Sequence, residues 1–246
     1  MQDLYTADTA RQYGYYIYQN LIHSLLLRKQ ERVRPLPEKG ASLLFWGISI
    51  IIGGEFSPAN GEALLSALDA LDSPLFLYYP DEPWRAFLQS RLKERLKNSR
   101  LHVYRFSHED IVPSQEDCPC IVPVTRDFME KDRPNTHLIT DELYSYTDRE
   151  DYYESGLGVA LVMDGAVAGY CLSEYSLDNS LGVNIWIDES CRGRGYAKKM
   201  VYAFLQHCHT KGQDAYWVCD ADNLLSNKVA RSCGFTLQSQ LDYFVI

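Results

Sequence analysis

The sequence lacks the long apolar runs that a membrane-spanning helix requires. Its longest run, residues 43–52, is interrupted by Gly47 and Ser49 and has about half of the roughly 20 residues needed to cross a bilayer. The opening residues are not basic, and no small-residue cleavage site follows an apolar segment, so we expect no signal peptide. These absences favour a globular protein of the cytoplasm with no membrane partner.

Positive charge is also scarce. The chain has 24 Lys and Arg against 33 Asp and Glu, a net charge of −9, which argues against a general nucleic-acid binder. The length of 246 residues and the hydrophobic content of 46% suit one large domain or two ordinary ones, each with a real core.

Paired metal-ligand and redox spacings are missing as well. The seven cysteines, an odd number without regular spacing, indicate reduced thiols in a cytoplasm. Cys118 and Cys120 are separated by a single residue, which fits neither a zinc knuckle nor a redox C-x-x-C motif. On a helix, His207 and His209 would point about 200° apart and could not share a metal ion. We therefore expect no metal site.

The two common nucleotide-binding motifs, the P-loop and the three-glycine dinucleotide fingerprint, do not match this chain's glycine-rich stretch. That stretch is Cys191-Arg192-Gly193-Arg194-Gly195-Tyr196-Ala197, and it lies between an alternating strand at residues 183–187 and a helix. The helix carries one apolar stripe: Ala197, Met200, Val201, Phe204, Leu205 and Cys208. Gly212 is placed to end the helix. The pattern predicts a strand, a glycine turn and a helix N-terminus in direct succession.

This turn has the features of an anion site. A strand that passes through glycines into a helix brings free backbone N–H groups and the positive end of the helix dipole together. Gly193 and Gly195 permit close approach of a ligand and positive φ angles. Arg192 and Arg194 add charges that suit phosphate oxygens. We predict that the turn binds a diphosphate; the alternative is an exposed turn with two solvated arginines.

A second motif follows in the right order. After a short strand at residues 215–219 come Asn223-x-x-Ser226 and, eleven residues after the asparagine, Gly234-Phe235. Together with Arg192-x-x-Gly195-x-Ala197, this motif resembles the GCN5-related N-acetyltransferase (GNAT) superfamily, over residues 121–246. The large N-terminal part resembles a bacterial two-domain group within that superfamily.

The resemblance implies a site for acetyl-CoA or another acyl-CoA, with the pyrophosphate on the turn and the pantetheine between the two flanking strands. The residues it implies for this binding are Trp186, Ile187, Arg192, Gly193, Arg194, Gly195, Tyr196, Ala197, Asn223 and Ser226. Asn223 and Ser226 precede and start a short helix, where Ser226 can cap the helix and Asn223 can brace the turn before it. That structural role is the alternative for this pair.

A segment containing prolines and acidic residues, 110–120, predicts the domain boundary. It separates an N-terminal α/β domain of unknown role, residues 1–117, from an acetyltransferase-like domain, residues 118–246. Within the first, we predict a β-α-β-α-β order that begins with one buried strand over residues 43–52. The helix that follows this strand is capped by one of two candidates, Asn60 or Ser57.

The second domain is predicted in the order β-α-α-β-β-β-α-β-α-β-β, with a tight hairpin at Asp164-Gly165. The resembled superfamily shows this order. It implies an acyl-CoA N-acyltransferase fold, an α/β (α+β) structure in which helices flank a mixed, largely antiparallel sheet.

The chemistry implied is direct transfer of an acetyl group from a thioester to an amine within a ternary complex. It requires a base for the ammonium, N–H donors for the tetrahedral oxyanion and an acid for the leaving thiolate. By the resemblance, the backbone at residues 186–187 supplies the donors, and a tyrosine seven residues after Asn223 would be the acid. Ala230 occupies that position. Ser226, Tyr243 and water are left as candidates for the acid.

Three carboxylates lie at strand ends near the place where the superfamily has its cleft: Glu174, Asp178 and Asp220. We favour Glu174 as the general base, and the alternative for each of them is a solvated carboxylate. Cys191 and Cys219 could act as acyl-cysteine nucleophiles, but direct transfer needs none, and buried cysteines are commonly small apolar fillers.

Two functions are open at this point. The first is an acyl-CoA-dependent N-acetyltransferase, which the two motifs favour. The second is a non-catalytic acyl-CoA-binding sensor or interaction module, which Ala230 favours. The acceptor could be an aminoglycoside, a polyamine, an amino acid or a protein amine. The oligomeric state is also open, with a homodimer among the alternatives.

Overall fold

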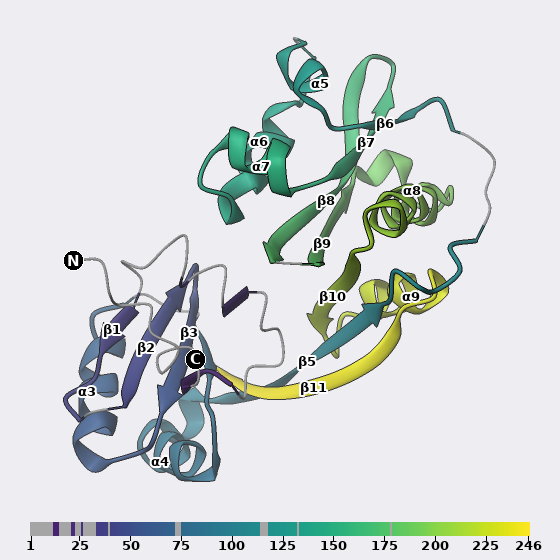
Figure 1. Cartoon of the computed structure of the whole chain (residues 1–246). Coiled ribbons are helices and arrows are strands. Elements are labelled where there is room, and N and C mark those ends of the chain that lie inside the picture. The colour runs from purple at the N-terminus through teal and green to yellow at the C-terminus, as the bar shows by residue number, and fades with distance from the viewer. Residues whose placement is uncertain are drawn as a thin grey trace. The chain divides into compact units, whose positions relative to one another are not determined.

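The computed structural model contains two compact units (Figure 1). It describes residues 12–14, 21–22, 26, 33–38, 40–71, 75–113, 118–131, 133–177 and 179–246. The first unit consists of Met1–His102, Asp220–Asp222 and Ser239–Ile246, and the second of Val103–Cys219 and Asn223–Gln238. The predicted domain boundary at 117/118 falls within the second unit, so it divides the chain differently and stays a prediction.

The first unit is built on a mixed sheet. Its strands are β1 (Val33–Pro35), β2 (Ala41–Trp46), β3 (Ser49–Gly54) and β4 (Phe76–Tyr78), followed by the C-terminal end of β11 (Thr236–Val245). β3 and β4 run parallel, and the other neighbours in this order are antiparallel. Leu43, Ile50 and Ile52 belong to a core that also holds Trp84 and Phe244.

The single buried strand predicted over residues 43–52 is wrong. The segment is a hairpin in which Trp46 of β2 pairs with Ser49 of β3. Gly47 adopts φ +56°, a left-handed conformation that suits glycine, and it reverses the chain inside the apolar run. Both strands are largely buried, so their apolar sequences continue up to the turn on either side.

Two helices of the first unit begin at side-chain caps. They are α3 (Pro58–Leu68) and α4 (Glu82–Leu92), and the 3-10 helix η2 (Lys93–Arg95) follows α4. Ser57, one of the two predicted caps, accepts a hydrogen bond from the Asn60 N–H at 3.1 Å. Asp81 caps α4 through the Trp84 N–H at 3.2 Å. The fully buried Trp84 indole donates to the Gly54 carbonyl at 3.0 Å and ties α4 to the end of β3.

The second unit holds a longer run of strands. In sheet order after the first part of β11, they are β5 (Lys97–Phe106, of which the part from Val103 belongs to this unit), β10 (Asp214–Asp220, up to Cys219), β9 (Ser180–Ile187), β8 (Ala166–Leu177), β7 (Gly158–Met163) and β6 (Ile121–Pro123). β6 to β9 are antiparallel neighbours, whereas β9 and β10 are parallel. The two strands predicted at the end of the chain are wrong. Residues 236–245 contain no glycine or proline and form the one strand β11.

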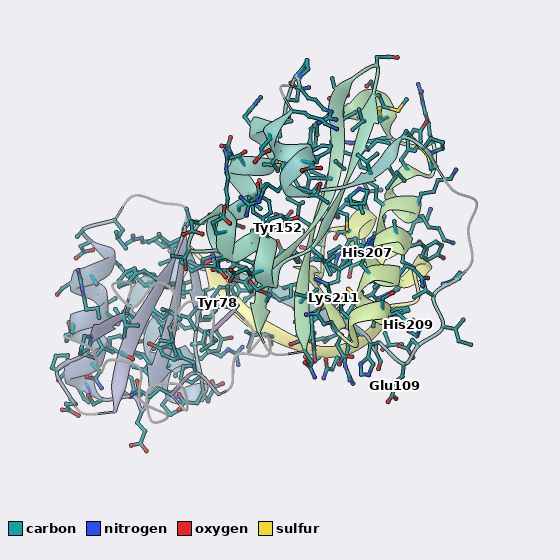
Figure 2. The ribbon with its side chains drawn as sticks, turned by 45° about the horizontal axis from the view of Figure 1, so that its top comes forward. Tyr78, Glu109, Tyr152, His207, His209 and Lys211 are labelled. Carbon is teal, nitrogen blue, oxygen red and sulfur yellow. A yellow bond between two sulfur atoms is a disulfide. The ribbon has the colours of Figure 1, made fainter. Side chains whose placement is uncertain are left out.

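Helices cover both faces of these strands (Figure 1). One layer consists of α8 (Tyr196–Lys211) and α9 (Leu224–Ser232), and the other of α5 (Arg126–Glu130), α6 (His137–Asp141), the 3-10 helix η3 (Glu142–Ser145) and α7 (Arg149–Ser155). Phe204 and Leu205 pack the first layer against the sheet. Phe128, Ile139 and Tyr152 pack the second, and Figure 2 labels Tyr152.

The predicted alternation of the strand before the turn is confirmed. Val183 belongs to the core on the α8 side, whereas Trp186 packs against the core on the side of α5 to α7. The apolar stripe of the helix is confirmed too, since Met200 and Phe204 are fully buried. Gly212 ends α8 with φ +65°, as expected of a left-handed cap.

The predicted hairpin at Asp164-Gly165 is also confirmed. It joins β7 to β8, and Met163 pairs with Ala166 across it. The two turn residues have φ +50° and +83°, the pair of positive angles that a two-residue hairpin turn needs.

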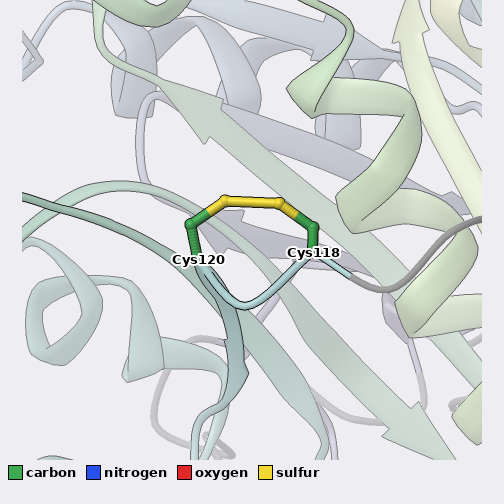
Figure 3. The surroundings of a disulfide bond; sticks show 2 residues. All are labelled: Cys118 and Cys120. Atoms are coloured by element: carbon green, nitrogen blue, oxygen red, sulfur yellow. A yellow bond between two sulfur atoms is a disulfide. The ribbon is translucent and has the colours of Figure 1, made fainter.

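Two of the seven cysteines correct the expectation of reduced thiols. Cys118 and Cys120 are joined by a disulfide just before β6 (Figure 3). The spacing rules for metal sites and C-x-x-C motifs do not cover a disulfide that closes across a single residue. The cysteines outside this disulfide are all buried: Cys171, Cys191, Cys208, Cys219 and Cys233. Cys191 and Cys219 lie in the core beside α8 and serve there as small apolar fillers.

The histidines of α8 contact separate backbone carbonyls (Figure 2). His207 Nδ1 lies 2.7 Å from the Ala203 oxygen, and His209 Nδ1 lies 2.6 Å from the His108 oxygen. In the part of the chain that the structure describes, no group of three or more His, Cys, Asp or Glu could hold a metal ion. Nor does any helix of that part combine the length and apolarity needed to cross a membrane.

Candidate functional site

The predicted strand, turn and helix are confirmed. β9 ends at Ile187, the 3-10 helix η4 (Glu189–Cys191) follows, and α8 begins at Tyr196. Gly193 and Gly195 adopt φ +73° and +79°, and Gly195 is the N-cap of α8. Glycine takes this conformation at little cost, so these two residues let the chain turn directly into a helix of 16 residues.

The surface over this turn is open. A Cβ atom added to Gly193 or Gly195 would meet no heavy atom within 4 Å. Gly195 has no side chain to cap α8, so the first N–H groups of the helix and its dipole remain available to an anion. A backbone of this shape fits a pyrophosphate, which needs several N–H donors at close range.

The two arginines of the turn differ in their surroundings. The Nε of Arg192 donates to the Ile187 carbonyl at 3.1 Å, and its guanidinium lies 3.3 Å from the Glu189 carboxylate. Arg194 is exposed and forms no ion pair with any residue that the structure describes. Arg192 therefore shapes the turn, and Arg194 is the better candidate for direct contact with a phosphate.

β9 and β10 share only a short ladder. Its last pair is Tyr216 with Gly182, and no pair between these strands follows among the described residues although both continue. The Asp188 N–H donates toward β8, to the Ala168 carbonyl at 2.9 Å. Because N–H groups alternate along a strand, the Ile187 N–H points to the other edge, toward β10. Ile187 thus presents a backbone donor beside the turn, where the ladder has ended.

Asn223, not Ser226, caps α9. The Asn223 Oδ1 accepts a hydrogen bond from the Ser226 N–H at 3.1 Å, so the predicted capping role of Ser226 is wrong. The Ser226 hydroxyl instead accepts from the Trp217 Nε1–H at 2.9 Å. Trp217 lies on β10 and is 3% exposed, so this bond links α9 to the strand beside β9.

We expect Ser226→Ala to lower the free energy of unfolding by about 1–3 kcal/mol, because the buried Trp217 Nε1–H would lose its acceptor. Urea denaturation measures this. The matched control is Ser232→Ala, which removes an exposed hydroxyl from the same helix and should change the free energy by less than about 0.5 kcal/mol. Lost stability with unaltered kinetics would remove Ser226 from the site, whereas a lower kcat at unchanged acetyl-CoA affinity would place its hydroxyl at the thioester.

The other candidates for the acid are constrained by their surroundings. Ala230 is fully buried and has no proton to give. Tyr243 is 2% exposed and donates a hydrogen bond to Asp220; burial, followed by this bond, raises the pKa of Tyr243 to about 12. Tyr78, labelled in Figure 2, stacks on its ring at 4.8 Å. Tyr243 and Asp220 belong to the first unit, whereas the turn and α9 belong to the second.

Glu174 lies on the side of β8 that faces α5 to α7. The ladder with β9 pairs Leu172 with Asn184 and Glu174 with Gly182, and directly opposed residues lie on one face of an antiparallel pair. Glu174 is half-buried. This burial, followed by the negative charge of Glu142, raises the pKa of Glu174 to about 7. The favoured base thus has a pKa suited to proton transfer near neutral pH.

A β-bulge follows Glu174 directly. The register between β8 and β9 shifts between Glu174 and Leu177, and Tyr175 adopts φ +47°, which is unusual for a bulky residue. Bulges of this kind re-aim side chains and are frequent next to functional sites. Asp178, the second candidate base, lies outside the described residues.

Glu142 also lies on the face of β8 and β9 toward α5 to α7, although no sequence pattern predicted that it belongs to the site. It opens η3, and its carboxylate accepts hydrogen bonds from the Asn184 Nδ2–H at 2.7 Å and from the Tyr170 hydroxyl. Burial, and then the charge of Glu142, raises the pKa of Tyr170 above its ordinary value. Glu142 is far from Glu174 in the chain, in a segment of short helices without a regular apolar period, so only the fold brings the two carboxylates together.

Comparison with known proteins agrees with this geometry. A family model described as GNAT acetyltransferase matches residues 34–244. No curated protein matches the chain. A GCN5-related N-acetyltransferase-like protein from Streptococcus suis 89/1591 superposes with a TM-score of 0.66 at 16% identity, with 96% of each chain covered. A GCN5-related N-acetyltransferase from Kribbella flavida gives 0.58 at 17% identity, covering 96% of this chain and 95% of the other.

A tandem GNAT protein from the clavulanic acid biosynthesis pathway is similar as well, with a TM-score of 0.59 at 12% identity over 97% of this chain and 93% of the other. At such identities these structures establish the fold, a mixed sheet flanked by helices. The family match extends over most of the sequence and includes the turn and the Asn223 motif. The chain therefore belongs to the GNAT acetyltransferase family.

Proposed function

We propose that this chain is an acetyl-CoA-dependent N-acetyltransferase that transfers the acetyl group directly to an amine. The observation that carries the proposal is the turn before α8, with two glycines at positive φ, an open surface and a helix N-terminus free of a side-chain cap. The residues that would hold the pyrophosphate are Arg192, Gly193, Arg194, Gly195, Tyr196 and Ala197. Those that would border the pantetheine and thioester are Trp186, Ile187, Asn223 and Ser226.

Glu174 is the general base of this proposal. Its raised pKa, about 7, suits the carboxylate to take a proton from an ammonium at neutral pH. Gly182 lies opposite Glu174 and is five residues before Ile187 on β9, roughly 16 Å at about 3.3 Å per residue, so the proton would reach Glu174 along a chain of waters. The deprotonated nitrogen then has a lone pair with which to attack the thioester carbonyl. Glu174 passes the proton on to solvent and returns to its charged form.

Ile187 would stabilise the tetrahedral oxyanion, because its N–H points to the edge where the ladder between β9 and β10 has ended. The C–N bond forms, the C–S bond then breaks, and the nitrogen gives up its second proton as the sulfur takes up one, so the products are an N-acetylated amine and CoA. The Ser226 hydroxyl accepts from Trp217 and keeps its own O–H to donate, and the proton released by the nitrogen would restore it, which makes Ser226 the preferred acid ahead of water and Tyr243.

A non-catalytic acyl-CoA-binding sensor or interaction module is the second candidate function, and the buried Ala230 at the tyrosine position favours it. For either function we propose a cytoplasmic protein that acts without nucleic acid or membrane. A homodimer is the assembly to test first.

Release of the CoA thiol, detected with a thiol reagent across a panel of amines, tests the proposal. We expect turnover with at least one amine, together with saturable acetyl-CoA binding in calorimetry. Binding without turnover on any amine would favour the sensor, and the absence of acetyl-CoA binding would contradict both functions.

A further inference from the structure

We infer that the acceptor is an aliphatic diamine or polyamine, held by its second ammonium group on the face of β8 and β9 that Glu142 and Glu174 share. This inference rests on the proposed acetyl transfer, because it names the substrate class of the same site. The face combines two carboxylates, a stacked aromatic pair and a buried hydroxyl that has no partner among the described residues.

The pairing of β8 with β9 places these groups together. The ladder sets Tyr170 opposite Trp186, Leu172 opposite Asn184, and Glu174 opposite Gly182. These alternate residues lie on the face toward α5 to α7. Glycine has no side chain, so β9 places nothing directly across from the Glu174 carboxylate. η3 then adds Glu142 to this face through its hydrogen bond with the Asn184 amide.

The two carboxylates have no cationic counterpart in the described part of the chain. Glu142 accepts its hydrogen bonds from an amide and a phenol, both neutral. Neither Glu142 nor Glu174 forms an ion pair with a described residue. The neighbouring titratable groups are Tyr144 and Tyr170, whose pKa values are raised and which therefore stay uncharged at neutral pH. Two half-buried like charges without a counter-ion favour the binding of a cation.

An unsatisfied hydroxyl points to the same ligand. Ser145 is 4% exposed, and its Oγ has no hydrogen-bond partner among the described residues. It follows Glu142 by one turn of η3, and residues three apart on a 3-10 helix eclipse one another, so both side chains lie on one face. A buried hydroxyl is costly to leave unpaired, and an N–H of a bound ammonium would satisfy it.

The apolar groups of the face suit a methylene chain. Tyr170 and Trp186 stack with ring centroids 5.9 Å apart, and Leu172 lies between Tyr170 and Glu174 along β8. Aromatic faces attract ammonium groups and also pack against methylenes. Glu142 contacts Asn184 and Tyr170 and so lies nearer to Ile187 along the strands than Glu174 does. A diamine would hold its second ammonium at Glu142, on the side toward Glu174, and extend its reacting nitrogen past Trp186 toward Ile187. An amino-acid acceptor would bring a carboxylate into the same negative field and be repelled.

Steady-state kinetics with matched amines test the inference. 1-Aminobutane and 1,4-diaminobutane have the same carbon chain and differ by the second ammonium. We expect kcat/KM for 1,4-diaminobutane to exceed that for 1-aminobutane by at least about tenfold. In Glu142→Gln, which keeps an oxygen for the Asn184 hydrogen bond, this preference should fall to within about twofold, mainly through KM. Glu154→Gln, which removes an exposed carboxylate from α7, should keep the full preference.

Equal kcat/KM for the two amines, or a preference that survives in Glu142→Gln, would overturn the inference and leave the proposed acetyl transfer standing. Failure of the proposed function would be seen separately, as no CoA release with any amine. In that case calorimetric titration of spermidine into the whole chain, saturated with CoA, tests the cation site on its own. Binding that Glu142→Gln weakens about tenfold supports the cation site, and binding that is absent or unaffected by the substitution overturns it.

Discussion

Replacing Glu174 by glutamine should lower kcat by about 10²- to 10⁴-fold while acetyl-CoA affinity stays within about twofold. The variant keeps the size and polarity of the side chain but cannot accept a proton from the ammonium. Glu174 lies on the side of β8 toward α5 to α7, whereas the turn opens α8 on the other side, so the acyl-CoA contacts should be preserved. Steady-state kinetics and calorimetry measure the two quantities.

The pH dependence gives an independent measure of the same role. Because the pKa of Glu174 is raised to about 7, its carboxylate is protonated below that pH and charged above it. We expect kcat of the unmodified protein to rise through pH of about 7 and then level off, and Glu174→Gln to lose this rise. Glu142→Gln should move the midpoint to lower pH, since a like charge no longer opposes ionisation.

Ionisation of Glu174 should lower the stability of the folded protein as pH rises, whereas it raises kcat. Folding raises the pKa of Glu174 from 4.5 to about 7, so its contribution to stability is fully present below pH of about 4.5 and is lost as pH rises through about 7. Glu154→Gln, which changes an exposed carboxylate on α7, is the control for both kcat and stability and should change neither. A folded Glu174→Gln protein that keeps more than about half of its kcat would exclude Glu174 as the base.

Gly195→Asp should weaken acetyl-CoA binding by at least about tenfold, or 1.4 kcal/mol. The substitution introduces a Cβ and a negative charge into the open space where the pyrophosphate should approach, and it forces a side chain into φ +79°. Aspartate is also a good N-cap, so its carboxylate would compete with the phosphate for the first N–H groups of α8. Calorimetric titration of acetyl-CoA measures the loss.

Gly165→Asp provides the matched control for that variant. Gly165 has φ +83°, and a Cβ there would also meet nothing within 4 Å, but it lies in the hairpin between β7 and β8. The same backbone strain and the same charge are introduced away from the turn, so acetyl-CoA affinity should be unchanged. If both variants bind acetyl-CoA as the unmodified protein does, the turn is not the pyrophosphate site.

Local patterns predicted the turn and the helix after it because everything that determines them is close in sequence. The alternation ending at Ile187, the glycines at 193 and 195 and the stripe through Phe204 each specify a conformation without help from distant residues. The same applies to Asp164-Gly165, whose positive φ angles follow from residue type.

The features that the sequence patterns could not predict depend on contacts with residues far along the chain. The apolar run at 43–52 fits a buried strand as well as a buried hairpin, because burial removes the polar residues that would mark a turn. Asn223 and Ser226 are both residue types that cap helices well, so their sequence does not say which one is the cap. In the structure the Ser226 hydroxyl accepts a hydrogen bond from the distant Trp217 indole, and the Asn223 side chain caps the helix. Glu142 reaches the site through Asn184, and no spacing rule links the two.

The path of β11 has a consequence for how the protein is made. Tyr243 and Phe244 pair with Tyr78 and Leu77 of β4, and Leu75 exchanges backbone hydrogen bonds with Ile246. The first unit therefore takes its closing strand from residues that the ribosome adds after the whole second unit. During synthesis the edge of β4 that pairs with β11 stays unpaired until the end of the chain has been made. We therefore expect the second unit to form first, and the first unit to be completed only when residues 239–246 have left the ribosome.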